Sequence, residues 1–111
     1  MKTTFKLYRY ENLIKTEMLY IEELPEERTY KIRVEGDNIE EILNRIYLPE
    51  RLKQQMRDDI VNIVKGYNLV ATQLGAYTKE NNELCKKYFR DMLDKFCKIH
   101  GSYYKYEEDQ I

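Results

Sequence analysis

Apolar and polar residues alternate along the first third of the chain, which is the pattern of half-buried β-strands. The alternation is clearest over residues 28–35, and two similar stretches, residues 4–10 and 16–24, precede it. Pro25 favours a chain reversal before the last stretch, because proline cannot donate a ladder hydrogen bond. The pattern predicts three antiparallel strands with one buried and one polar face. In the last strand, the face predicted to be buried consists of Tyr30, Ile32 and Val34.

Beyond Gly36 the apolar residues recur at intervals of three and four, the spacing of one helix face. A short helix is predicted to begin at Asp37, which can cap the first turn together with Glu40, and to end before Pro49. A long helix follows Pro49, and Gly66 marks a place where it can bend or break. Its apolar stripe consists of Leu52, Met56, Ile60, Ile63, Tyr67, Val70 and Leu74.

A third helix is predicted over residues 78–100, with Thr78 as its cap and Gly101 as its end. The short connection at 75–78 makes the last two helices an antiparallel hairpin. Cationic side chains in the last turn suit the negative end of the helix dipole. The apolar stripe of this helix consists of Leu84, Tyr88, Met92, Phe96 and Ile99, and it is widened by Cys85, Phe89 and Leu93.

These elements predict an α+β fold in which a three-stranded antiparallel sheet packs, in two layers, against a short helix and a long helical hairpin, in the order βββααα. Residues 1–101 are predicted to form one domain, and residues 102–111 an acidic, tyrosine-containing tail that is free to be flexible. The apolar stripe of the long helix spans about 35 Å. Strands of this length span only about 20–25 Å. The excess predicts a homodimer formed through the helical hairpin.

Composition narrows the function classes. Hydrophobic residues make up 42% of the 111 residues and charged residues 35%, with a net charge of -1, so a strong basic excess for binding nucleic-acid phosphates is missing. No apolar run approaches the roughly 20 residues that cross a bilayer. The first residues do not have the pattern of a signal peptide. A cytoplasmic location is the resulting prediction.

The stretch around Cys97 and His100 is the first candidate for chemistry. If residues 78–100 form one helix, Cys85 lies about 18 Å along the axis from Cys97, too far for a disulfide or a shared metal ion. Cys97 and His100 share a face, but two ligands do not complete a metal site. We therefore predict no catalytic residue, no metal site and no cofactor, and keep a small Cys/His enzyme as the third alternative.

Eleven tyrosines in 111 residues are the most unusual feature of the composition. Tyrosine offers a large contact area with a polar tip, so it suits protein interfaces. The first function predicted is therefore a small protein-binding module, an inhibitor or adaptor of the phage, mobile-element or immunity-protein type. Its predicted partner-binding residues are Tyr8, Arg9, Tyr10, Tyr103, Tyr104 and Tyr106.

Aromatic residues interleaved with cations also stack on the bases of single-stranded nucleic acid. The alternative function is therefore a weak single-stranded nucleic-acid-binding protein. The residues predicted for that function are Lys6, Tyr8, Arg9 and Tyr10.

Overall fold

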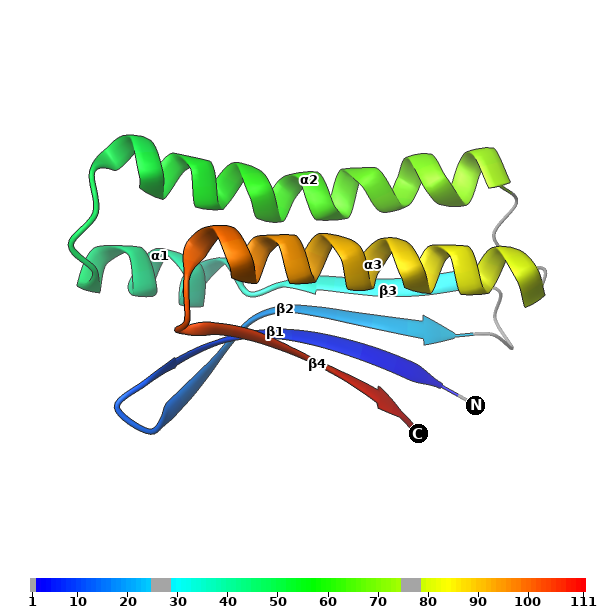
Figure 1. The fold of residues 1–111 in the computed structure, drawn as a ribbon, viewed down its shortest axis with the longest axis horizontal. Coiled ribbons are helices and arrows are strands. Elements are labelled where there is room, and N and C mark those ends of the chain that lie inside the picture. Colours follow the sequence, from blue (N-terminus) through cyan, green and yellow to red (C-terminus); the bar gives the residue numbers. More distant parts are fainter. Residues whose placement is uncertain (1, 25–28, 75–78) are drawn as a thin grey trace.

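The computed structural model is an α+β fold with one antiparallel sheet and three helices on one face of it (Figure 1). It describes residues 2–24, 29–74 and 79–111, and the side chains of residues 2–24, 30–66 and 82–111. The predicted turn at Pro25 and cap at Thr78 lie outside the described residues, as do the side chains of the stripe positions from Tyr67 onward. In chain order, the elements are β1 (Thr3–Glu11), β2 (Ile14–Leu24), β3 (Thr29–Val34), α1 (Gly36–Arg45), α2 (Glu50–Leu74), α3 (Lys79–His100) and β4 (Tyr104–Gln110).

The sheet has four strands in the order β3-β2-β1-β4, and all neighbours are antiparallel. The α+β class is confirmed, but the prediction of a three-stranded sheet is wrong, because the sheet has a fourth strand. Residues 104–110, predicted to lie in an irregular tail, form the edge strand β4 beside β1. The two ends of the chain meet there, since Lys2 and Ile111 exchange two backbone hydrogen bonds of 3.0 and 2.7 Å.

The β1–β2 pair closes with a two-residue turn and carries one irregularity. Asn12 and Leu13 both have positive φ, at 50° and 66°, as a type I′ turn requires. The register shifts after Leu7, where Met18 is the extra residue of β2. The Met18 carbonyl accepts a hydrogen bond of 3.1 Å from the backbone amide of Glu35, which ties the bulge to the start of α1.

The helices bury apolar residues against the sheet, although the predicted cap of the first helix is wrong. Helix α1 has Glu35 rather than Asp37 as its N-cap, without a side-chain cap hydrogen bond. Helix α2 continues through Gly66 without a break. A Cβ atom at Gly66 would lie 1.7 Å from the Tyr88 hydroxyl, so glycine is needed there for the close approach of α3. The Tyr88 hydroxyl donates to the Ile63 carbonyl at 3.2 Å.

The core lies between the sheet and the helices. Its largest fully buried side chains on the sheet side are Phe5, Leu7, Met18, Leu19 and Ile21, and those on the helices are Ile42, Leu43, Met56, Ile60, Ile63, Phe89 and Leu93. The first position of the predicted α2 stripe, Leu52, is exposed, whereas Met56, Ile60 and Ile63 are buried within the chain. The described part of the stripe therefore leaves little area for a second copy, and the homodimer stays a prediction. Within the described residues, no helix is long and apolar enough to cross a bilayer.

Candidate functional site

The strand register separates residues that are neighbours in sequence. Side chains alternate between the two faces of a strand. Phe5 and Leu7 of β1 lie in the core, so Arg9 points to the same helix-covered face. Lys6, Tyr8 and Tyr10 point to the opposite face of the sheet, which we call the open face. The nucleic-acid-binding set predicted from the sequence is therefore split between two surfaces.

The tyrosines near the C-terminus are divided in a similar way. Tyr103 is exposed in the turn between α3 and β4, whereas Tyr104 is buried against the helices. Tyr106 is half-buried beside the core on the same face as Tyr104. The predicted partner-binding set is thus not one exposed cluster, and only part of it reaches a common site, described below.

Two cations on the open face, Lys15 and Arg33, have acidic partners within the chain. The Lys15 ammonium lies 3.9 Å from the centroid of the Tyr8 ring and 2.7 Å from Oε1 of Glu107. The hydrogen bond to Glu107 holds the pKa of Lys15 above its usual value. Arg33 donates to Oε2 of Glu17 at 2.8 Å. These cations are engaged by acids and rings of the same sheet, which lowers the charge that the face offers to a ligand.

The cysteines lie on one unbroken helix, α3, as the sequence predicts. Burial, with a smaller contribution from Asp94, raises the pKa of the Cys97 thiol to about 11. Burial also raises the pKa of Cys85. Because the nucleophile is the thiolate, neither cysteine is activated at neutral pH. Among the described residues, no three His, Cys, Asp or Glu side chains are grouped so that they could hold a metal ion.

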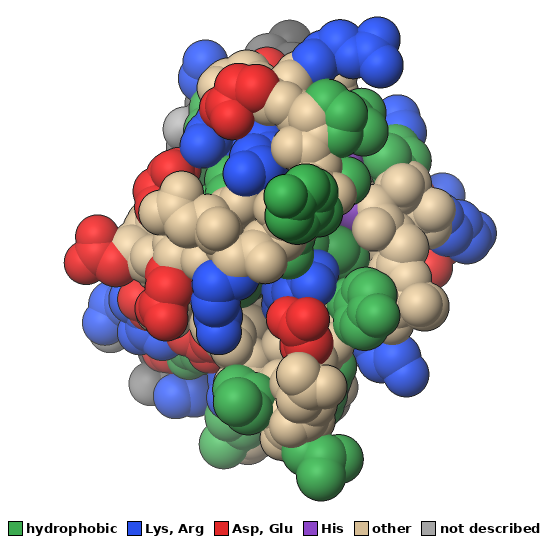
Figure 2. Space-filling view, turned by 90° about the vertical axis from the view of Figure 1, so that its left-hand side faces the viewer, with side chains coloured by type: hydrophobic (Ala, Val, Ile, Leu, Met, Phe, Trp, Pro, Cys, Tyr) green, Lys and Arg blue, Asp and Glu red, His purple; other side chains and the backbone are tan. Residues whose placement is uncertain are grey.

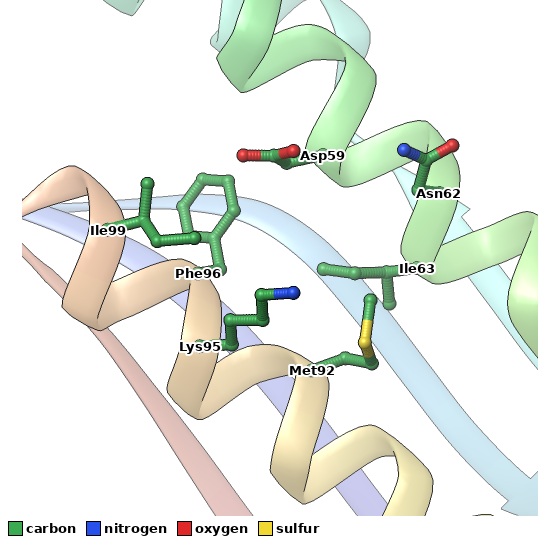
Figure 3. Close-up of a pocket in the computed structure, with 7 residues that line it drawn as sticks. All are labelled: Asp59, Asn62, Ile63, Met92, Lys95, Phe96 and Ile99. Carbon is green, nitrogen blue, oxygen red and sulfur yellow. The ribbon is translucent and has the colours of Figure 1, made fainter.

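His100 has a structural partner on the neighbouring helix. Its Nε2 atom lies 2.7 Å from Oδ2 of Asp59 in α2, and its ring lies 4.4 Å from the Phe96 ring between centroids. Asp59 also borders a groove of about 110 Å³ between α2 and α3 (Figure 3). Apart from Asp59, the groove is lined by Asn62, Ile63, Met92, Lys95, Phe96 and Ile99. The groove is small, and its carboxylate is already bound by His100, so we do not assign it a ligand.

A larger pocket opens at the end of the molecule where three connections meet. These are the β1–β2 turn, the α1–α2 connection at residues 46–49 and the α3–β4 turn at residues 101–103, all at the left in Figure 1. The pocket has a volume of about 410 Å³. Its lining consists of Arg9, Glu11, Arg45, Ile46, Tyr47, Leu48, His100, Tyr103 and Tyr104. A smaller pocket of about 50 Å³ shares Arg9, Glu11 and Arg45 with it and reaches Asn12, Ile14 and Thr16 on the hairpin.

We call this region the end surface, and it carries large exposed apolar side chains. Leu13 at the hairpin tip and Tyr47 in the α1–α2 connection are fully exposed. Ile14, which follows Leu13 in the chain, Leu48 and Tyr103 are partly exposed. Figure 2 views the molecule from this end and shows hydrophobic side chains in several clusters among charged ones.

Arg9 forms the floor of the pocket and is held in place by two aromatic rings. It is 7% exposed, and its Nη1 donates to the Tyr104 hydroxyl at 2.8 Å. Its guanidinium carbon lies 4.8 Å from the Tyr103 ring centroid and 5.2 Å from that of Tyr104. Burial raises the pKa of Tyr104, so this hydroxyl stays protonated at neutral pH. The ion pair from Nη2 to Glu11 is long, at 3.4 Å.

Arg45 adds a second cation from the last turn of α1, and it has no ion pair within the described part of the chain. Sequence reasoning included Arg9, Tyr103 and Tyr104 but missed Arg45, Tyr47 and Leu48. Two apolar residues directly before Pro49, in a connection, are the signal that was available.

Comparison with known proteins does not connect this site to a family. No protein-family model matches the chain, no curated protein matches it, and no solved structure matches it.

Proposed function

We propose that the protein is a non-enzymatic protein-binding module that docks a partner through its end surface and acts as an inhibitor or adaptor by occupying that partner. The observation that carries the proposal is Leu13. A fully exposed leucine stands at the second position of a type I′ turn, with φ of 66°, where glycine is preferred. Both its conformation and its exposure are unfavourable for the isolated fold. A contact with a partner accounts for leucine at this position.

The other residues of the end surface suit a protein interface. Tyr47 and Tyr103 supply exposed aromatic area, and Arg9 and Arg45 supply guanidinium groups. Tyrosine and arginine are the residue types enriched at energetically important interface positions. Arg9 lies in β1 and Arg45 in the last turn of α1, so secondary structure fixes both backbone positions before binding.

The nucleic-acid alternative stays a prediction with less support. Its residues on the open face, Lys6, Tyr8 and Tyr10, lie among cations that pair with Glu17 and Glu107. Binding of single strands relies on unpaired positive charge next to stacking rings. The Cys/His enzyme alternative also has less support, because burial keeps the Cys97 thiol protonated.

The test compares quantitative capture of proteins from extracts of the source organism by three forms of the chain. These are the wild type, the double variant Leu13→Asn with Tyr47→Ser, and a control with Leu84→Asn, which replaces an exposed leucine of α3 outside the end surface. A partner should be retained by the wild type and the control and lost from the double variant.

The captured partner is then purified and its dissociation constant is measured by calorimetry. Truncation of a hot-spot side chain weakens binding by about 30-fold or more. Equal affinity of the double variant and the control would contradict the proposal, as would an extract in which the wild type retains nothing beyond what the double variant retains.

A further inference from the structure

The pocket of the end surface combines cations with an apolar wall. Arg9 lies at its floor and Arg45 at its side, while Ile46, Tyr47 and Leu48 form the wall. At about 410 Å³, it falls within the range of about 300–1,000 Å³ that is typical of ligand pockets. It therefore has room for a charged side chain together with part of its neighbour.

The guanidinium of Arg9 is prepared for a planar anion. Its guanidinium carbon lies 4.8 Å from the Tyr103 ring centroid and 5.2 Å from that of Tyr104, and these cation–π contacts leave the positive charge in place. One terminal nitrogen donates to the Tyr104 hydroxyl and the other makes a single long contact of 3.4 Å with Glu11. A guanidinium has five N–H donors, and its geometry matches a carboxylate.

From the two guanidinium groups that line the pocket and the single long contact of Arg9 with Glu11, we infer that the pocket binds the carboxylate of an aspartate or glutamate side chain on the partner's docking segment. An apolar residue next to that acid packs on Tyr47 and Leu48. The inference rests on the proposed function, because it names the chemistry of the segment that the end surface receives. Arg9 and Arg45 attract the carboxylate, and the charge-assisted hydrogen bonds to them are stronger than neutral ones.

Glu11 is the opposing charge in the pocket. Its carboxylate is about half-exposed and occupies the Nη2 side of Arg9 through one long contact. An incoming carboxylate replaces this contact, so Glu11 competes with the ligand. Removal of the Glu11 charge should therefore tighten binding of an acidic ligand, an effect that a general loss of structure would not produce.

The test begins with a library of random heptapeptides attached to beads through their C-termini, so that no free C-terminal carboxylate is present. Selection on the wild-type protein should enrich peptides with Asp or Glu beside an apolar residue. The best peptide is then compared by calorimetry with two variants, one in which Gln or Asn replaces the acidic residue and one in which phosphoserine replaces it. A third control is the Gln or Asn peptide with a free C-terminus, whose only carboxylate is the C-terminal one. The acidic form should bind about 10-fold or more tightly than the amide form.

Three variants locate the binding. Arg45→Gln should lower the affinity for the acidic peptide about 10-fold or more, and Glu11→Gln should raise that affinity. Arg51→Gln, which removes an exposed arginine of α2 that does not line the pocket, should leave affinity unchanged. Arg45 is exposed in the last turn of α1, so its variant is expected to fold.

Several outcomes would overturn the inference. They are enrichment without an acidic position, equal binding of the acidic and amide peptides, stronger binding of the phosphoserine form or of the C-terminal carboxylate alone, and unchanged affinity of Arg45→Gln. A selection that yields no binder would also overturn it, and a wild-type dimer that Arg45→Gln dissociates would assign the pocket to a second copy of the chain.

The inference and the proposed function can fail separately. If the captured partner is lost from the Leu13 and Tyr47 double variant but binds Arg45→Gln as tightly as the wild type, the end surface docks a partner without a carboxylate in the pocket. If the double variant keeps the partner, the proposed function fails whatever the peptides show.

Discussion

The open face of the sheet and the end surface contain the same residue types, tyrosine with lysine or arginine, in opposite states. On the open face, the Arg33 guanidinium lies 4.7 Å from the Tyr20 ring centroid and also pairs with Glu17. On the end surface, Arg45 has no ion pair within the described residues, and Leu13 and Tyr47 are bare. Arg33 is thus engaged within the chain, whereas Arg45, Leu13 and Tyr47 of the end surface are exposed.

This difference shows that composition alone does not locate a binding surface. Exposed ion pairs contribute little to stability, but they occupy the charges that a ligand would need. Exposed apolar side chains and unpaired guanidinium groups in one place mark an interface more reliably. Variants of matched residues in the two regions, or two variants of one residue, test this difference.

Substitution of the pocket floor should have the largest effect on stability. Arg9→Met removes the donor to the buried Tyr104 hydroxyl and the cation between two rings, so the free energy of unfolding should fall by about 2 kcal/mol. Lys15→Met, on the open face, should change stability little because its pair with Glu107 is exposed. Urea unfolding monitored by circular dichroism gives both values.

If both Arg9→Met and Lys15→Met leave the free energy of unfolding unchanged, Arg9 contributes no more to stability than a surface cation, and the predicted difference between the two regions is contradicted. A double-mutant cycle with Tyr104→Phe isolates the contact. Its coupling should be about 1 kcal/mol.

The hairpin tip should show a trade between stability and binding. Leu13→Gly matches the left-handed conformation of the turn, so it should stabilise the fold by up to about 1 kcal/mol while weakening partner binding. Leu13→Ala should weaken binding equally without that gain, because alanine keeps a Cβ in the left-handed region. Thermal unfolding and the partner's dissociation constant, measured on both variants, check the prediction. Stronger binding by Leu13→Gly would remove the functional reason for leucine at the tip.

Much of this architecture could be predicted from hydrophobic periodicity, and the misses have physical reasons. The helices and first three strands form where hydrophobic periodicity predicts them, because burial of one face dominates. The predicted apolar faces are only partly buried, since Val34, Leu52, Leu84 and Ile99 are exposed. Strand β4 was missed because its helix-covered face begins with Tyr104 and Tyr106 but continues with Glu108, which breaks the apolar alternation. Glu108 is satisfied by Arg90 of α3, a partner that the local sequence of β4 does not reveal.

The site was only partly predictable for a related reason. Alternation along β1 does place Arg9 with Phe5 and Leu7, but adjacency to two tyrosines suggested an exposed cluster. The partner of Arg9, Tyr104, lies 95 residues away in the chain. The pocket exists only because three connections converge at one end of the sheet, and convergence of this kind depends on tertiary structure.

The smallest predicted effect separates the two faces of a single strand. Adjacent glutamates of β4 point to opposite sides, Glu108 to Arg90 of α3 at 2.8 Å and Glu107 to Lys15 on the open face. The hydrogen bond from Arg90 holds the pKa of Glu108 below its usual value. A depressed carboxyl pKa contributes stability above the unfolded-state pKa of about 4.3 and loses it as pH falls through the folded-state value.

Glu108→Gln should therefore lower the free energy of unfolding by at most about 1 kcal/mol at pH 7, since the pair is partly exposed to solvent. The difference from the wild type should close as the pH is lowered past 4 toward 2, where the wild-type carboxyl is protonated. Glu107→Gln is the matched control and should differ little from the wild type at either pH. Urea titrations at several pH values test the pair of variants, and a pH-independent loss in Glu108→Gln would mean that packing rather than charge joins β4 to α3.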